Sequence, residues 1–147
     1  MIRLDAHQRI GWDFDGTLVQ GPNSGLFRAY IATHTEKRHH VLTFRDRQWA
    51  VLIGPELHKL GLDPSLIASV ENCPEPLHDM FMLSSEPDSN VPRRVAAKVA
   101  HHFLRWKGGR ARELGCTILV DDMAEWVVLG CQENGITFLD ANVAVVA

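Results

Sequence analysis

The sequence has few cysteines, no long apolar stretch and no excess of basic charge. Its three cysteines, Cys73, Cys116 and Cys131, are widely spaced and form no C-x-x-C arrangement, so we expect reduced thiols rather than a disulfide framework or a zinc site. No run approaches the roughly 18 apolar residues that a membrane span requires. The N-terminus reaches charged residues before a secretory apolar segment can form. We therefore expect a cytoplasmic protein.

The charge balance argues against a protein that coats nucleic acid, and the histidines argue against a zinc site. The formal net charge is −3 over 147 residues, unlike the basic excess of a protein that coats nucleic acid. The eight histidines show no metal-ligand motif of the kind that zinc requires. The chain contains no internal repeat, low-complexity segment or linker, so we expect one domain over residues 1–147 that buries roughly two thirds of its unfolded surface.

Strand-like apolar runs alternate with helical spacing along the chain. Strands are predicted at 7–12, 39–44, 80–83, 117–120 and 136–139. Helices are predicted at 26–37, 48–60, 65–70, 91–107, 110–114 and 124–131, with the glycines at 108 and 109 interrupting the helical spacing. This alternation is typical of an α/β protein with a parallel sheet, helices on both faces and right-handed crossovers.

Two carboxylates stand directly after the first predicted strand. Asp13 and Asp15 precede Gly16 and Thr17, which allow a sharp turn. At the carboxyl end of a parallel strand they occupy the place where open α/β sheets bind ligands. Because like charges a few ångströms apart need a proton or a cation, a divalent metal is the simplest partner. The alternative is a strand followed by an Asp-Gly turn with nothing bound.

Three more polar residues are expected at the same edge of the sheet. Thr43 closes the second strand, and Asp121 and Asp122 follow the strand at 117–120. Hard oxygen ligands suit Mg²⁺, which usually takes one or two carboxylates together with a substrate phosphate. Each residue also has an ordinary explanation, since Thr is common in strands and Asp is a favoured N-cap. Their joint occurrence is what indicates a site.

These motifs, in this order, resemble the haloacid dehalogenase-like (HAD) superfamily of phosphohydrolases, in its small capless form. The resemblance comprises D-x-D-G-T at 13–17, a Thr that closes the next strand, a Lys before the fourth strand and the acidic pair. It implies a three-layer Rossmann-like fold and a magnesium-dependent phosphatase that acts on phosphate monoesters. Asp13 would be the nucleophile that forms an aspartyl-phosphate. Asp15 would be the acid/base that protonates the leaving group and then activates water.

The same resemblance implies roles for the other residues. Mg²⁺ would be held by Asp13, the backbone carbonyl of Asp15 and Asp122, with Asp121 assisting from behind the direct ligands. Thr43 and a lysine would hold the phosphoryl oxygens.

Two lysines compete for that position, and an arginine lies close by. Lys107 precedes the glycine pair, so its side chain can point back toward the carboxyl edge of the sheet, and we favour it. Lys98 has the spacing more usual in larger relatives but lies in the middle of a helix; for either residue the alternative is a surface lysine. Arg45, just after Thr43, is a candidate bidentate donor to substrate phosphate.

The substrate is indicated only as a class. The gaps between motifs leave no room for a cap domain, so we expect an open site, which in the superfamily often accompanies large substrates or an oligomer. Between Arg93 and Arg112 the chain carries seven Lys or Arg and no acid, with Trp106 among them. Such a strip suits the phosphates of a nucleotide or nucleic acid, and the alternative is a solvated helix face with Trp106 in the core.

The expected partner is thus a phosphorylated small molecule, a nucleotide or a nucleic-acid end, and not a membrane. A homo-oligomer is an option, and the short apolar tail at 143–146 would be an edge strand or a dimer contact.

Two other functions share the same residues. A phosphotransferase would pass the phosphoryl group to an acceptor other than water, and nothing in the sequence separates it from a phosphatase. A phospho-ligand binding or scaffold protein would keep the fold without turnover, although intact Asp13 and Asp15 argue against it. A receiver domain combines similar residue types, but its nucleophile ends a middle strand, so the motif order excludes it.

Overall fold

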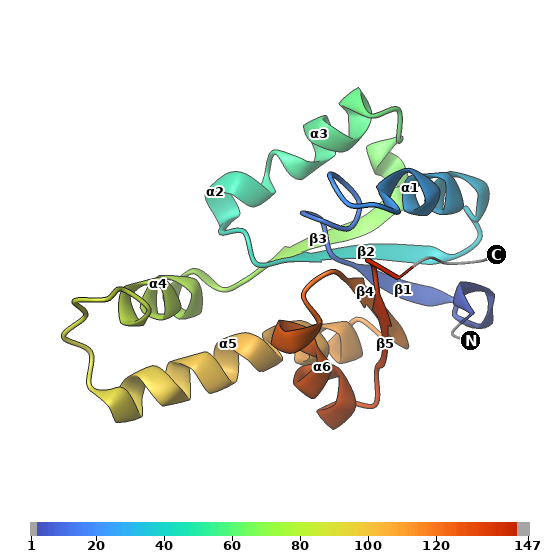
Figure 1. The fold of residues 1–147 in the computed structure, drawn as a ribbon. Helices are drawn as coiled ribbons and strands as arrows, with labels where there is room; N and C mark the ends of the chain where they lie inside the picture. The colour runs from blue at the N-terminus through green and yellow to red at the C-terminus, as the bar shows by residue number, and fades with distance from the viewer. Residues whose placement is uncertain (1–2, 144–147) are drawn as a thin grey trace.

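The computed structural model describes residues 3–143, which are built around a five-stranded parallel sheet (Figure 1). The strand order is β3-β2-β1-β4-β5. The strands are β1 (Arg9–Trp12), β2 (Arg38–Thr43), β3 (Ile67–Asn72), β4 (Ile118–Asp121) and β5 (Thr137–Asp140). The central strand β1 pairs with β2 and β4 on its two sides, and all four strand pairs are parallel. The predicted α/β architecture, Rossmann-like and three-layered, is confirmed.

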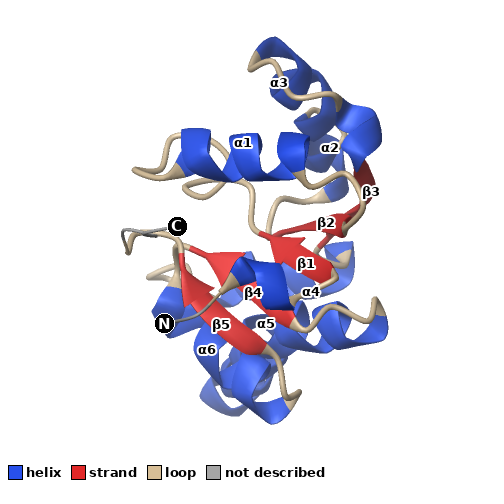
Figure 2. Ribbon diagram, turned by 90° about the vertical axis from the view of Figure 1, so that its right-hand side faces the viewer, coloured by secondary structure: helices blue, strands red, loops and turns tan. Residues whose placement is uncertain are grey.

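Helices cover both faces of the sheet (Figures 1 and 2). One face carries α1 (Ser24–Thr33), α2 (Arg47–Ala50) and α3 (Ile53–Lys59), and the other carries α5 (Arg93–Glu113) and α6 (Ala124–Glu133). Helix α4 (Glu75–Ser84) lies beside α5, and short 3₁₀ turns occur at Leu4–Ala6 and Pro64–Leu66. Within residues 3–143, no helix combines the length and the apolar character that crossing a membrane would take.

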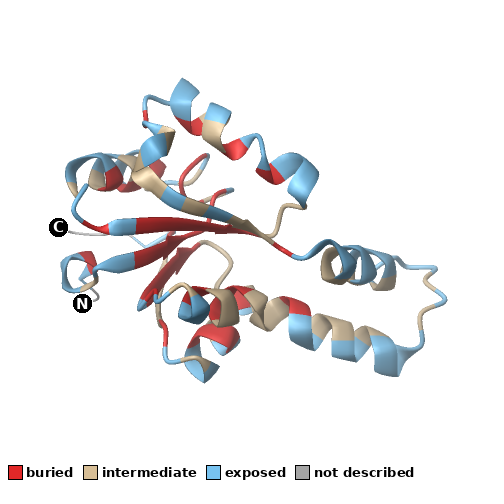
Figure 3. Cartoon of the chain, turned by 180° about the vertical axis from the view of Figure 1, so that it is seen from behind, coloured by how far each residue is buried: buried red, intermediate tan, exposed pale blue. Residues whose placement is uncertain are grey.

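Two apolar layers fix the sheet between its helices. The layer toward α1, α2 and α3 includes Trp12 and Phe27, both almost fully buried. The layer toward α5 and α6 includes Leu42, Leu119 and Val127. Burial of each such side chain stabilises the fold by about 1.5–3 kcal/mol. Figure 3 shows the buried strands at the centre, whereas α4 and the first half of α5 project beyond the sheet and are largely exposed.

Two predictions in the middle of the chain are wrong. Of residues 65–70, expected as a short helix, the first two lie in the 3₁₀ turn and residues 67–70 belong to β3. Residues 80–83, expected as the third strand, belong to α4. Strand β3 lies at the edge of the sheet, where partial exposure removes the continuous apolar run that marks a buried parallel strand. In α4, Phe81 stacks on Phe103 with ring centroids 3.9 Å apart, whereas Met82 and Leu83 are about half exposed.

The expected interruption at Gly108 and Gly109 is also wrong, since α5 continues through both residues. Gly108 lies against the backbone of Gly130 in α6, where an added Cβ would collide with the Gly130 carbonyl group. The glycine therefore permits a close approach of two helices instead of ending one.

Smaller differences concern element ends. The helix predicted at 26–37 stops at Thr33, and the one predicted at 48–60 is divided into α2 and α3. The predicted tail contact at 143–146 lies outside the described residues except for Val143.

Candidate functional site

The strand order reverses direction at the central strand β1. From β1 the chain proceeds outward to β2 and β3, then crosses to the other side of β1 for β4 and β5. Ligands in open α/β sheets bind outside the carboxyl ends of the strands at such a reversal point. Asp13 directly follows β1 and Asp121 ends β4, and the Asp13 amide donates to the Val120 carbonyl at 2.8 Å. Side chains distant in the sequence therefore meet at this edge.

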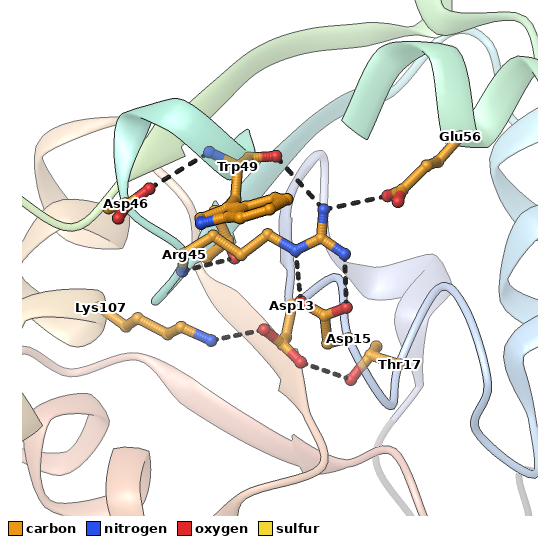
Figure 4. Close-up of polar contacts among 9 residues, drawn as sticks. Asp13, Asp15, Thr17, Arg45, Asp46, Trp49, Glu56 and Lys107 are labelled. Carbon is orange, nitrogen blue, oxygen red and sulfur yellow. Dashed lines mark hydrogen bonds and ion pairs between the residues drawn. The ribbon is translucent and has the colours of Figure 1, made fainter. Parts of the chain in front are cut away.

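Lys107 connects the two acidic strand ends. Its Nζ donates to Oδ1 of Asp13 at 2.6 Å (Figure 4) and to Oδ2 of Asp121 at 2.7 Å. The side chain is 1% exposed, and Nζ lies 4.4 Å from the ring centroid of Phe44, a cation–π contact. Of the two candidate lysines, the structure brings Lys107 into the site, whereas Lys98 is exposed on α5.

Burial and neighbouring charge change how these groups titrate. Burial raises the pKa of Asp13 above its usual range, while Lys107 opposes the rise and Asp121 adds to it. For Lys107, burial lowers the pKa, but the carboxylates of Asp13 and Asp121 outweigh this effect and the pKa is raised. The lysine is therefore charged at neutral pH.

Asp122 completes an acidic cluster beside Lys107. Carboxylate oxygens of Asp13, Asp121 and Asp122 lie within 4.8 Å of one another. Oδ1 of Asp122 is buried without a hydrogen-bond partner in the described part of the chain. The turn after β1 presses against this carboxylate through Gly16, which has φ of 82°, and an added Cβ there would collide with Asp122. A glycine at this turn thus leaves space for the carboxylate.

These oxygens fit a hard divalent cation. One lysine offsets the charge of one carboxylate, and among residues 3–143 the buried Oδ1 of Asp122 has no hydrogen-bond partner. Oxygen-only donor sets with net negative charge suit Mg²⁺. Both oxygens of Asp121 are already engaged, by Lys107 and by the Met123 amide at 2.9 Å. Both oxygens of Asp13 also accept hydrogen bonds, from Lys107 and from Thr17. Asp122 is therefore the side chain best able to hold the ion, and Asp13, beside it in the cluster, would bind through the lone pairs that these hydrogen bonds leave free.

Two buried hydroxyls lie at the same edge. Thr17 donates to Oδ2 of Asp13 at 3.2 Å (Figure 4). This contact was not predicted from the sequence, although Thr17 belongs to the D-x-D-G-T stretch. Thr43 ends β2 as predicted and is 1% exposed. Its Oγ1 accepts from the Arg45 amide at 3.1 Å, so its own proton is not used in that contact.

Arg45 faces Asp15 in the structure. Its Nε and Nη2 donate to the two Asp15 oxygens at 2.7 and 2.8 Å, a bidentate pair (Figure 4). Its Nη1 donates to Oε2 of Glu56 at 3.0 Å and to the Trp49 carbonyl at 3.3 Å. The sequence predicted Arg45 as a donor to substrate phosphate and gave no signal for Glu56, an ordinary charged residue of a short helix.

The basic strip between Arg93 and Arg112 is partly neutralised within the chain. Arg105 pairs with Glu133, and Arg110 pairs with both Glu71 and Glu113. Trp106 is partly buried and its ring lies 6.1 Å from that of Phe44. These contacts favour the solvated helix face over a continuous phosphate-binding strip.

Comparisons with known proteins give no family for this chain. No family model and no curated protein matches it. Among solved structures, the chain is similar to an uncharacterized protein from Corynebacterium glutamicum ATCC 13032 Kitasato. The two share 18% identity over 90% of this chain and 83% of that one, with a TM-score of 0.47. Similarity at this level carries no argument about function.

Proposed function

We propose that this protein is a magnesium-dependent phosphohydrolase that cleaves a phosphate monoester through an aspartyl-phosphate on Asp13. The observation that carries the proposal is the buried ion-pair cluster in which Lys107 bridges Asp13 and Asp121, with Asp122 alongside. The resemblance to the HAD superfamily implies the roles of nucleophile, lysine and metal ligands for these residues. Membership of that superfamily, in capless form, is part of the same proposal.

The proposed reaction has two displacements. A carboxylate oxygen of Asp13 attacks phosphorus, the bond to the leaving-group oxygen breaks, and Asp15 gives that oxygen its proton. Asp15 then takes a proton from water while the water oxygen attacks phosphorus and the bond to Asp13 breaks. Mg²⁺ held by Asp13, the Asp15 backbone carbonyl and Asp122 would neutralise charge as the anionic substrate approaches.

Fixed donors supply the rest of the proposed stabilisation. The Nζ of Lys107 already lies 2.6 Å from Asp13, close to where a phosphoryl oxygen must arrive. The Thr43 hydroxyl at the end of β2 is a second donor. Preorganised donors in a buried site stabilise developing charge more than the same groups do in water, because they need no reorganisation during the reaction.

Several finer expectations stay predictions. They are the substrate class (a phosphorylated small molecule, a nucleotide or a nucleic-acid end), the cytoplasmic location and a homo-oligomeric state. A phosphotransferase and a non-catalytic phospho-ligand binding protein would use the same residues, so the experiment has to separate them from a phosphatase.

The direct test is hydrolysis of p-nitrophenyl phosphate by wild type and Asp13→Asn, with and without Mg²⁺. We expect magnesium-dependent phosphate release that falls to background in the variant, because an amide cannot act as the nucleophile. Circular dichroism of both proteins controls for folding. Turnover that survives Asp13→Asn would refute the nucleophile assignment. Transfer to an added alcohol would indicate a phosphotransferase, and phosphate binding without turnover a binding protein.

A further inference from the structure

A chain of charged groups connects α3 to the turn that follows β1. Glu56 of α3 accepts a hydrogen bond from Nη1 of Arg45, and Nε and Nη2 of Arg45 donate to the Asp15 carboxylate (Figure 4). The Arg45 guanidinium carbon also lies 4.7 Å from the centroid of the Phe14 ring, the residue between the two motif aspartates. Two separate segments, the turn after β1 and helix α3, therefore meet at the Arg45 side chain.

We infer that Glu56 is a positioning residue: it orients Arg45 so that the arginine fork fixes both carboxylate oxygens of Asp15. Arg45 is then a positioning residue as well, and not a ligand of the substrate phosphate. The inference rests on the proposed function, in which Asp15 is the acid/base: the fork occupies one lone pair on each Asp15 oxygen, and the transferred proton uses a lone pair that remains.

The donor inventory of Arg45 supports this role. A guanidinium has five N–H groups, and a bidentate grip on phosphate needs two parallel ones on the same edge. The Nε–Nη2 edge is used by Asp15, and Nη1 donates to Glu56 and to the Trp49 carbonyl. These contacts leave a single N–H on Nη2. Arg45 therefore has no edge to offer a phosphate group unless it leaves Asp15 or Glu56.

Asp15 needs such a restraint because of its position. Its side chain is 49% exposed. In the described part of the chain, the hydrogen bonds to its carboxylate come from Arg45 alone. An acid/base must stay within hydrogen-bond reach of the reacting oxygen, and a displacement of about 1 Å can lower the rate by up to about 100-fold.

A stability measurement would not reveal this role, because exposed ion pairs contribute little to folding free energy. The test is therefore kinetic. The substrate is p-nitrophenyl phosphate with Mg²⁺, and the variants are Glu56→Ala, Glu56→Gln and Arg45→Lys. The matched control is Glu133→Ala, which removes a similar partner, at 2.9 Å, from Arg105 on the outer helices.

We expect Glu56→Ala to lower kcat by about 10- to 100-fold, with KM and the inhibition constant of inorganic phosphate unchanged. Glu56→Gln should recover part of the loss, since its amide oxygen still accepts from Nη1. Arg45→Lys should also lower kcat, because an ammonium group cannot present a planar fork. Glu133→Ala should behave as wild type.

Wild-type kcat in Glu56→Ala would overturn the inference. The inference would also be overturned if Arg45→Lys raised KM and the inhibition constant of phosphate at constant kcat. That result would mean that Arg45 binds the substrate phosphate. Absence of turnover in wild type would count against the proposed function instead. In that case the ¹⁵N-edited NMR signal of the Arg45 Nε–H tests the inference. A chemical shift that changes in both Glu56→Ala and Asp15→Asn supports the link from Glu56 through Arg45 to Asp15. A chemical shift that does not change in Glu56→Ala refutes it.

Discussion

Lys107 is surrounded by carboxylates and aromatic carbon instead of solvent. Its ammonium lies between Asp13 and Asp121 and against the Phe44 ring, with 1% of the side chain exposed. Removal of one member of a buried ion pair leaves uncompensated charge in a poorly solvated place. The lysine that the proposed reaction needs is therefore also expected to stabilise the fold.

Replacement of Lys107 by Met should lower the free energy of unfolding by about 3–5 kcal/mol, because two buried carboxylates lose their cation. Urea denaturation without Mg²⁺ measures the change. Lys98→Met, on the exposed face of the same helix, is the control and should change stability by less than about 0.5 kcal/mol. Equal stability of the two variants would contradict the charged cluster.

Single residues also divide into those that the sequence could identify and those that it could not. The convergence of Asp13, Asp121 and Asp122 was predictable, because parallel strands bring their carboxyl ends to one edge. Lys107 was favoured for a helix break at the following glycines, and it reaches the site from a continuous helix instead. The link from Glu56 to Arg45 was not predictable, because it depends on where α3 lies relative to the turn after β1. Side-chain pattern gives the type of an element more reliably than its placement.

Among the secondary-structure elements, α5 positions Lys107 through its packing on α6. Gly108, the next residue, touches the Gly130 backbone, whereas Gly109 has open space where its Cβ would be. The register of α5 against α6 depends on Gly108 and not on Gly109. The position of Lys107 relative to the edge of the sheet follows from this register.

Gly108→Ala should therefore destabilise the protein by about 1–3 kcal/mol, since the two helices must separate. Gly109→Ala is the matched variant on the same turn of α5. It should stabilise the protein by about 0.5–1 kcal/mol, because alanine restricts the unfolded chain and favours helix. Thermal or urea unfolding of both distinguishes them, and a stable Gly108→Ala would mean that the helices do not meet at this point.

The elements that sequence reasoning missed share one physical cause. Strand β3 sits at the sheet edge and α4 projects from the body, so neither has the burial that hydrophobic patterns report. The apolar run in α4 resembled a strand because its length fits either element. The central strands β1, β2 and β4, buried on both faces, were placed within a few residues.

On the scale of the whole molecule, the acidic cluster exists only when the sheet is complete. Asp13 follows β1, and Asp121 and Asp122 lie at the end of β4. An unfolded chain holds these groups far apart, so a cation that binds the cluster binds the folded state preferentially and stabilises it.

Mg²⁺ should accordingly raise the melting temperature of wild type, with a stabilisation of about 2.7 kcal/mol at a concentration 100 times the Kd. Asp122→Asn should lose most of this shift, since its unpaired buried oxygen no longer carries charge. Glu125→Gln, an exposed neighbour in α6, should keep it. Differential scanning fluorimetry with and without Mg²⁺ measures the shifts, and an equal shift in wild type and Asp122→Asn would rule out this ion site.

The connection between α4 and α5, residues 85–92, is largely exposed and divides the sequence between the two halves of the cluster. The stretch before it holds Asp13, Asp15 and Thr43, and the stretch after it holds Lys107, Asp121 and Asp122. A chain severed in this loop would yield two fragments, each with carboxylates but without a complete centre. If the cluster formed again when the fragments were mixed, the two halves of the chain would have reassociated by fragment complementation. The cluster therefore reports on the reassociation of the two halves.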